Sequence, residues 1–103
     1  MDKVYDYFML TNEIKYIQDN YPFIEIEIIG KSVKKRNIYA LRLGCGQREF
    51  FYNGAHHGME WITAKLLMRF VFDYAQSYAR GERLAGFNVR RLFENTSIYL
   101  VPM

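Results

Sequence analysis

The feature that most constrains the fold is a succession of an aromatic strand-like run, a long amphipathic helix and a second apolar run. Residues 48–55, REFFYNGA, are rich in aromatic residues that favour strands, and the run stops at Gly54. Residues 96–103, TSIYLVPM, are almost entirely apolar, as expected of an interior strand in a covered sheet. Residues 59–79 lie between them and predict a helix ending at Gly81, with apolar side chains at Trp61, Ala64, Leu67, Met68, Val71, Phe72 and Ala75. A strand, a helix and a strand in this order predict a right-handed parallel crossover.

The residues before this unit predict a helix and a β-hairpin. A helix is expected over residues 11–20, with Thr11 as its cap, Pro22 beyond its end, and an apolar face formed by Val4, Phe8, Ile14 and Ile17. Residues 23–30, FIEIEIIG, alternate in polarity like a strand with one wet face. The charged run 31–37 predicts the hairpin tip, and residues 38–44 predict the returning strand, with Arg42 at a wetter position. The predicted fold class is therefore α/β, with a mixed sheet made of a hairpin plus a parallel β-α-β crossover and covering helices.

The composition fits one packed domain. The chain has 103 residues, of which 50% are hydrophobic and 17% aromatic, values far from those of a disordered chain. The net charge is +3, and most basic residues fall into two groups that are typical of solvated turns or helix ends. These groups are Lys31, Lys34, Lys35 and Arg36, and Arg80, Arg83, Arg90 and Arg91. We therefore expect no nucleic-acid partner.

The cysteine count and hydropathy limit other classes of function. Cys45 is the only cysteine, so neither an intramolecular disulfide nor a thiolate zinc cluster is expected, and Cys45 is predicted to pack at a strand end. The sequence shows no secretory leader pattern and no apolar run of membrane-spanning length. We therefore expect no membrane partner and a cytoplasmic location.

Two histidines and a glutamate follow the aromatic strand, in the segment FYNGAHHGMEW at residues 51–61. Functional groups of α/β sheets collect beyond the carboxyl ends of parallel strands, where His56, His57 and Glu60 fall. An imidazole and a carboxylate three residues apart could bind Zn²⁺ if Gly58 permits a tight turn. The same residues could instead form a polar turn, with Glu60 favoured by the positive end of the helix. The spacing alone favours the polar turn.

Three segments in order resemble the zinc carboxypeptidase family, the carboxypeptidase A-like metallopeptidases. GAHHGMEWIT (54–63) resembles the first zinc-binding segment of that family, and EIIGKSVKKRNIYALRLG (27–44) resembles its hairpin. NTSIYLVPM (95–103) resembles the strand that, in the family, leads into an Asn-Pro-Asp-Gly turn. The resemblance extends from about residue 5 to residue 103, and it reverses the preference for a polar turn.

The resemblance implies a cofactor, two ligands and a domain boundary. The His-x-x-Glu motif of the family falls on His57 and Glu60, which would be two ligands of Zn²⁺, whereas His56 has no ligand role in the pattern. The implied reaction is hydrolysis of a peptide bond by zinc-activated water. The implied architecture is a partial α/β/α zinc-exopeptidase fold, with residues 1–103 as the N-terminal portion of the catalytic domain.

The sequence departs from the digestive members of the family at Met59, where they carry a substrate-binding arginine. HHGMEWIT is more similar to bacterial members, some of which cleave γ-D-glutamyl–diamino acid bonds of peptidoglycan. The resemblance therefore implies a peptide or a peptidoglycan peptide as the substrate.

Other parts of the family's machinery have no counterpart here. The third zinc ligand, the glutamate base and the arginines that hold the substrate carboxylate follow the segment that ends at Met103. No catalytic residue is therefore assigned, and the isolated chain is expected to be inactive; the alternative is a truncated, non-catalytic module that acts in binding or structure. The strand at 49–55 is expected to expose a sheet edge, so we also expect the isolated chain to self-associate.

Overall fold

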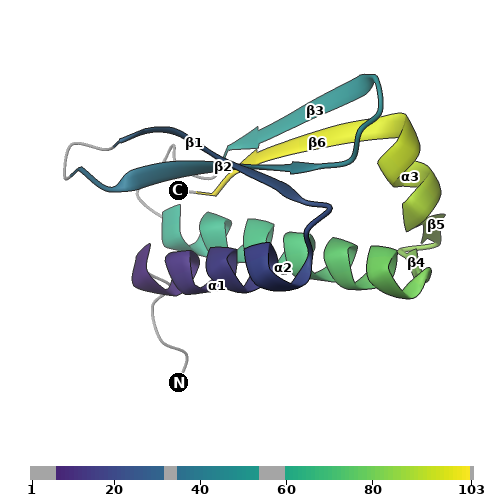
Figure 1. Ribbon diagram of the computed structural model, residues 1–103, viewed down its shortest axis with the longest axis horizontal. Coiled ribbons are helices and arrows are strands. Elements are labelled where there is room, and N and C mark those ends of the chain that lie inside the picture. The colour runs from purple at the N-terminus through teal and green to yellow at the C-terminus, as the bar shows by residue number, and fades with distance from the viewer. Residues whose placement is uncertain (1–6, 32–34, 54–59, 103) are drawn as a thin grey trace.

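The computed structural model describes the backbone of residues 7–31, 35–53 and 60–102, and the side chains of these residues except 53 and 60–63 (Figure 1). Its elements, in chain order, are α1 (Tyr7–Asn20), β1 (Glu25–Lys31), β2 (Asn37–Leu43), β3 (Arg48–Asn53), α2 (Glu60–Arg80), β4 (Arg83–Leu84), β5 (Phe87–Asn88), α3 (Val89–Asn95) and β6 (Thr96–Val101).

Four strands form one mixed sheet in the order β1-β2-β6-β3. β1 pairs antiparallel with β2, β2 pairs antiparallel with β6, and β3 pairs parallel with β6. The prediction of a hairpin joined to a parallel crossover is therefore confirmed. The strand predicted at the end of the sequence lies between the hairpin and β3, as expected.

Both long helices lie on the same face of this sheet (Figure 1). α1 lies under the hairpin, where the Tyr7 hydroxyl donates a hydrogen bond to the carbonyl of Asn37 at 2.9 Å. Tyr16 of α1 contacts Phe72 of α2, with ring centroids 5.8 Å apart. The core fills the space between helices and sheet, and its buried apolar side chains are Leu10, Ile14, Ile17, Ile24, Leu41, Leu43, Ala64, Met68, Val71, Tyr74, Ala75, Val89, Ile98 and Leu100.

The first helix differs from its prediction. It begins at Tyr7, and Thr11 is an interior residue whose hydroxyl donates to the carbonyl of Phe8 at 2.9 Å, so Thr11 is not the N-cap. Phe8 is 71% exposed and does not belong to the buried face, which is formed by Leu10, Ile14 and Ile17. The helix therefore includes residues before the cap that local propensity suggested, and Tyr7 at this end hydrogen-bonds to the hairpin.

The predicted alternation of inward-facing and solvent-facing side chains in β1 holds only in the first half of the strand. Ile24, just before the strand, is buried and Ile26 is half-buried, whereas Ile28 is 54% exposed. The pairing register with β2 shifts between Ile28 and Gly30, which leaves Ile29 as an extra residue. Such a bulge locally disrupts the ladder and bends its strand, so the two-residue alternation cannot continue through it.

The turn between β2 and β3 packs against the junction of α3 and β6. The Cys45 N–H donates to the Phe93 carbonyl at 2.8 Å, and the Gly46 N–H donates to the Thr96 carbonyl at 3.2 Å. The buried Ser97 hydroxyl donates to the Gly46 carbonyl at 2.7 Å. The prediction that Cys45 packs as a small apolar residue at a strand end is wrong, because its side chain is exposed while the backbone of Cys45 and Gly46 makes these contacts.

Tyr74 of α2 is fully buried, and its hydroxyl has no hydrogen-bond partner among the described residues. A buried hydroxyl without a partner loses its hydration and gains nothing in return. We therefore expect Tyr74→Phe to raise the free energy of unfolding by about 1 kcal/mol at pH 7. Urea denaturation measures this, with Tyr16→Phe at a 52% exposed position as the control, expected to change little.

The same substitution should alter stability at alkaline pH. Burial, followed by the influence of Tyr78, raises the pKa of the Tyr74 hydroxyl above its ordinary value. A group whose pKa is raised in the folded state contributes to stability. This contribution is complete below the unfolded-state pKa of about 10, and it is lost as the pH rises through the folded-state pKa. The loss of stability above pH of about 10 should therefore be smaller in Tyr74→Phe than in the unaltered chain. An equal loss in both proteins would contradict this assignment.

Candidate functional site

The candidate site lies where β3 and β6 end side by side. The two strands run parallel and in register from Arg48 beside Thr96 to Asn53 beside Val101. Their carboxyl ends therefore meet at one edge of the sheet, and the chain then enters α2 at Glu60. This is the position at which α/β sheets place ligand-binding groups.

The two predicted zinc ligands are only partly covered by the structure. His57, together with His56 and Met59, lies outside the described residues. Glu60 is the first residue of α2, and its side chain is not described. Within the described ranges, no three residues of histidine, cysteine, aspartate or glutamate are grouped to hold a metal ion. The assignment of His57 and Glu60 as ligands stays a prediction.

Helix electrostatics and ligand chemistry indicate what a carboxylate at position 60 could do. α2 has 21 residues, and the aligned peptide dipoles of a helix place partial positive charge at its first turn. A helix N-terminus of this kind favours a negatively charged side chain in general. An imidazole nitrogen from His57 and a carboxylate oxygen from Glu60 are both donors that Zn²⁺ accepts, although they supply two of the three protein ligands of a catalytic site.

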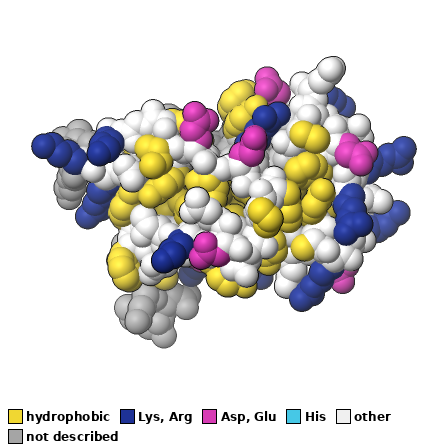
Figure 2. All heavy atoms as spheres, in the orientation of Figure 1, with side chains coloured by type: hydrophobic (Ala, Val, Ile, Leu, Met, Phe, Trp, Pro, Cys, Tyr) yellow, Lys and Arg dark blue, Asp and Glu magenta, His cyan; other side chains and the backbone are white. Residues whose placement is uncertain are grey.

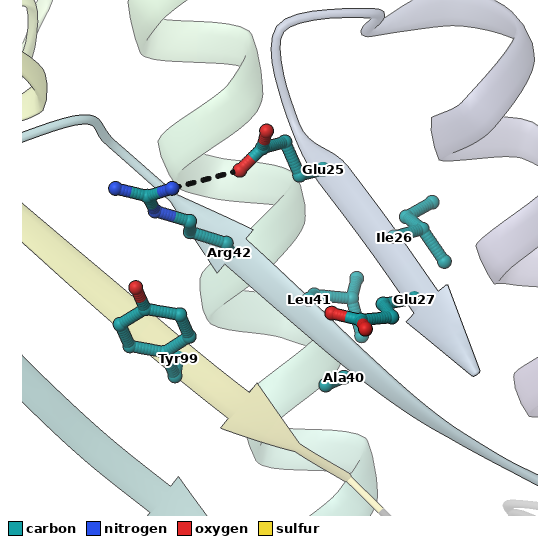
Figure 3. Close-up of a pocket in the computed structure, with 7 residues that line it drawn as sticks. All are labelled: Glu25, Ile26, Glu27, Ala40, Leu41, Arg42 and Tyr99. Atoms are coloured by element: carbon teal, nitrogen blue, oxygen red, sulfur yellow. Dashed lines mark hydrogen bonds and ion pairs between the residues drawn. The ribbon is translucent and has the colours of Figure 1, made fainter. Parts of the chain in front are cut away.

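A separate hollow of about 600 Å³ lies over β1, β2 and β6 (Figure 3). Arg42 is its central residue: its guanidinium lies 3.1 Å from the Glu25 carboxylate, donates to the Ser97 hydroxyl at 3.2 Å and lies 5.5 Å from the centre of the Tyr99 ring. The Tyr99 hydroxyl donates to Glu49 at 3.1 Å. Desolvation, followed by this hydrogen bond, raises the pKa of Tyr99.

The sequence indicated only that Arg42 occupies a wetter position, and the structure confirms that it is half-exposed. The partners of Arg42 come from β1 and β6, which no local pattern connects with it. The charge of Arg42 is paired with Glu25, and the cluster links side chains of β1, β2 and β6.

On the face that Figure 2 shows, the basic residues of the described chain do not form one continuous surface. Most of the visible Lys and Arg side chains lie at two opposite ends, at the β1–β2 hairpin tip and around β4, β5 and α3, and a few lie between them. Hydrophobic side chains occupy much of the visible face between them. Neither of the two long helices, over its described length, is apolar enough to span a membrane.

Comparisons of the sequence identify its relatives. The family profile of zinc carboxypeptidases matches residues 10–103. The chain is 35% identical over 99 residues to the gamma-D-glutamyl-L-diamino acid endopeptidase 1 of Lysinibacillus sphaericus, a match covering 96% of this chain and 25% of that protein. It is 29% identical over 97 residues to carboxypeptidase M of Mus musculus, covering 86% of this chain and 21% of that protein. The chain therefore spans about a quarter of the length of these curated relatives.

Solved structures share the fold. Bovine thrombin-activatable fibrinolysis inhibitor, in complex with tick carboxypeptidase inhibitor, matches with a TM-score of 0.77 at 20% identity, over 98% of this chain and 31% of that chain. A metallo-carboxypeptidase from Burkholderia cenocepacia matches with a TM-score of 0.75 at 18% identity, over 95% of this chain and 26% of that chain. The mixed sheet with its two covering helices thus corresponds to a part of the carboxypeptidase fold. With the family profile matching nearly the whole chain, the chain belongs to the zinc carboxypeptidase family.

Proposed function

We propose that the chain supplies the N-terminal part of a zinc-dependent peptidase, in which His57 and Glu60 are two of the protein ligands of the metal. The observation that carries the proposal is the position of the His-x-x-Glu segment, between the carboxyl end of parallel strand β3 and the first turn of α2. Membership of the zinc carboxypeptidase family supports the same chemistry. When bound, zinc supplies Lewis-acid chemistry that activates water for attack on a peptide carbonyl.

The chain contributes support for the metal but not the whole reaction centre. β3 and α2 fix the two ends of the ligand segment, because β3 is paired along its length with β6 and α2 is packed in the core. A catalytic zinc site needs a third protein ligand, and proton transfer needs a general base. Since the chain spans about a quarter of its curated relatives, we assign no residue of it to these two roles.

The proposed substrate is a peptide, and the relatives favour a peptidoglycan peptide. The similarity to a protein named as a gamma-D-glutamyl-L-diamino acid endopeptidase, at 35% identity, is higher than the 29% shared with carboxypeptidase M. We therefore place the substrate preference of the complete domain with the bacterial endopeptidase.

A zinc titration of the 103-residue chain tests the ligand assignment. Four ligands of a structural site provide about 10–16 kcal/mol, so two ligands should give roughly half, and binding should be weaker than a Kd of about 1 µM. His57→Ala and Glu60→Gln should each weaken zinc binding further. Calorimetry on the purified variants gives the affinity.

The neighbouring imidazole is the matched control for this titration. His56→Ala removes the same chemical group one position away and should leave the zinc affinity nearly unchanged. Nanomolar, stoichiometric zinc binding by the monomer would contradict the count of two ligands. Loss of binding in His56→Ala rather than His57→Ala would contradict the assignment of His57.

A further inference from the structure

The end of the sheet opposite to the candidate metal site carries a hollow of about 250 Å³. β3 and β6 begin at this end, beside α3 and β5 (Figure 1). One face of α3 forms a wall of the hollow, since Asn88, Arg91, Leu92 and Asn95 recur at spacings of three and four residues. Arg48, the first residue of β3, lines the hollow from the sheet.

Two guanidinium groups line this hollow without a counter-charge. Among the described residues, the side chains of Arg48 and Arg91 make no hydrogen bond or ion pair, and no carboxylate lines the hollow. Glu94 lines a neighbouring hollow together with Arg48, but no ion pair joins these two side chains. Arg83 and Arg90, at the same end of the molecule, each donate to a backbone carbonyl, at 2.8 and 3.1 Å. Since like charges repel, an anion between Arg48 and Arg91 would be favoured.

The other groups of the hollow are suited to an anion on an organic chain. The side-chain oxygen of Asn88 accepts from the backbone N–H of Arg91 at 3.2 Å, so its amide nitrogen remains as a donor. The amide of Asn95 offers further N–H donors to the same hollow. Phe87, which is 65% exposed, adds an apolar contact. Because a guanidinium presents its N–H groups in a plane that matches two carboxylate oxygens, this set of groups fits an organic carboxylate.

We propose that this hollow binds a free carboxylate of a polymeric peptidoglycan substrate, on a peptide unit other than the one that is cleaved. The inference rests on the proposed function, in which a peptidoglycan peptide is the substrate. In a gamma-linked glutamyl unit the peptide bond uses the side-chain carboxyl group, so the α-carboxylate remains free to bind. β3 has six residues, so about 17 Å separate the hollow from the metal-binding edge along the strand. One glutamyl unit cannot reach both places, and the hollow therefore holds a neighbouring unit of the polymer.

Retention of the 103-residue chain on insoluble peptidoglycan tests the site without any catalysis. The peptidoglycan is first extracted to remove phosphate-containing polymers, and a chelator is present so that zinc contributes nothing. The double variant Arg48→Gln with Arg91→Gln should weaken binding by at least about tenfold, because two charge-assisted contacts are lost. The matched control is Lys31→Gln with Lys35→Gln, which removes the same charge from two exposed residues of the β1–β2 hairpin at the opposite end of the molecule. This control should change the affinity by less than about twofold.

A complete domain tests whether the hollow is accessible there and serves the reaction. The protein for this test is a hybrid in which residues 10–103 replace the matching segment of the Lysinibacillus sphaericus endopeptidase. Its KM is measured for soluble peptidoglycan fragments of several units and for a single short peptide. The double arginine variant should raise the ratio of the first KM to the second by at least about fivefold, because the second attachment of the polymer is lost. The double lysine variant should leave this ratio unchanged.

Three outcomes would each overturn the inference. Equal losses of binding in the two double variants would mean that net charge alone attracts the polymer. Absence of binding after the phosphate-containing polymers are extracted would mean that the hollow does not recognise carboxylates. An unchanged KM ratio in the hybrid would mean that the hollow takes no part in a complete domain. Circular dichroism checks that every variant remains folded. Hydrolysis of the short peptide by the hybrid tests the proposed function by itself, so the two proposals can fail separately.

Discussion

A hybrid protein that carries residues 10–103 of this chain in place of the matching segment of the Lysinibacillus sphaericus endopeptidase is expected to hydrolyse peptides, and His57→Ala in that hybrid is expected to abolish the activity. The chain and the relative are 35% identical over 99 residues, so the segment should fit the rest of the relative's domain. The relative supplies the groups that we do not assign to this chain. Loss of a ligand removes zinc and several kcal/mol of Lewis-acid stabilisation, so kcat/KM should fall by a factor of at least about 1000.

The controls for the hybrid separate a ligand from a neighbouring polar residue. Glu60→Gln should cause a loss similar to that of His57→Ala, whereas His56→Ala should lower kcat/KM by no more than a factor of about 10. Zinc content, measured by mass spectrometry of the purified hybrids, should fall together with activity. Full activity and full zinc content in the His57→Ala hybrid would contradict the proposed site.

Gly46→Ala is expected to lower the stability of the fold strongly. A Cβ atom on Gly46 would overlap the backbone of Asn95 and Thr96, where α3 passes into β6. Backbone atoms cannot move aside as the end of a flexible side chain can, and the displaced turn would lose the hydrogen bond from Ser97 as well. We expect the free energy of unfolding to fall by at least about 3 kcal/mol, a large part of the total stability of a small domain. Urea denaturation followed by circular dichroism measures this loss.

Gly30→Ala is the matched control, because the same methyl group on Gly30 meets no atom of the described residues within 4 Å. Gly30→Ala should change the free energy of unfolding by no more than about 0.5 kcal/mol, as most surface substitutions do. Equal midpoints of denaturation for the two variants would show that the turn tolerates displacement and that the close approach of Gly46 to β6 is not required.

Much of the fold could be predicted because long patterns determine it. The periodicity of residues 59–79 predicted α2 to within one residue at each end, and the apolar character of residues 96–103 predicted a central strand. The errors lie where the chain makes tertiary contacts that local patterns do not reveal, as at Tyr7 of the first helix, which bonds to the hairpin, and in the turn at Cys45, whose side chain is exposed.

The small β4–β5 hairpin was not predicted from the sequence. Its turn residues, Ala85 and Gly86, both have positive φ angles, of 50° and 84°. This conformation is usually indicated by Asn-Gly or Asp-Gly, since alanine rarely adopts it. The sequence therefore lacks the ordinary signal for a turn of this kind.

The candidate site could be predicted only as a short motif with a family resemblance. His57 and Glu60 are close in sequence, so one segment suggests them, and the structure describes the strand and helix on either side. The Arg42 cluster joins residues of β1, β2 and β6 that are far apart in the chain. Such a group becomes visible only when the strand order is known.

The central place of β6 in the sheet has a consequence for how the protein forms during synthesis. β6 is the last described strand along the chain, yet it supplies the partners of both β2 and β3. On the ribosome, the β1–β2 hairpin can close early, whereas β3 and its aromatic residues must wait until α2, α3 and β6 have emerged. Closure of these distant pairs costs chain entropy before any contact compensates for it, which makes this step slow. The nascent chain therefore passes through a period in which the aromatic strand β3 has no partner. During this period its apolar side chains and unpaired backbone are exposed to aggregation, which chaperone binding would prevent.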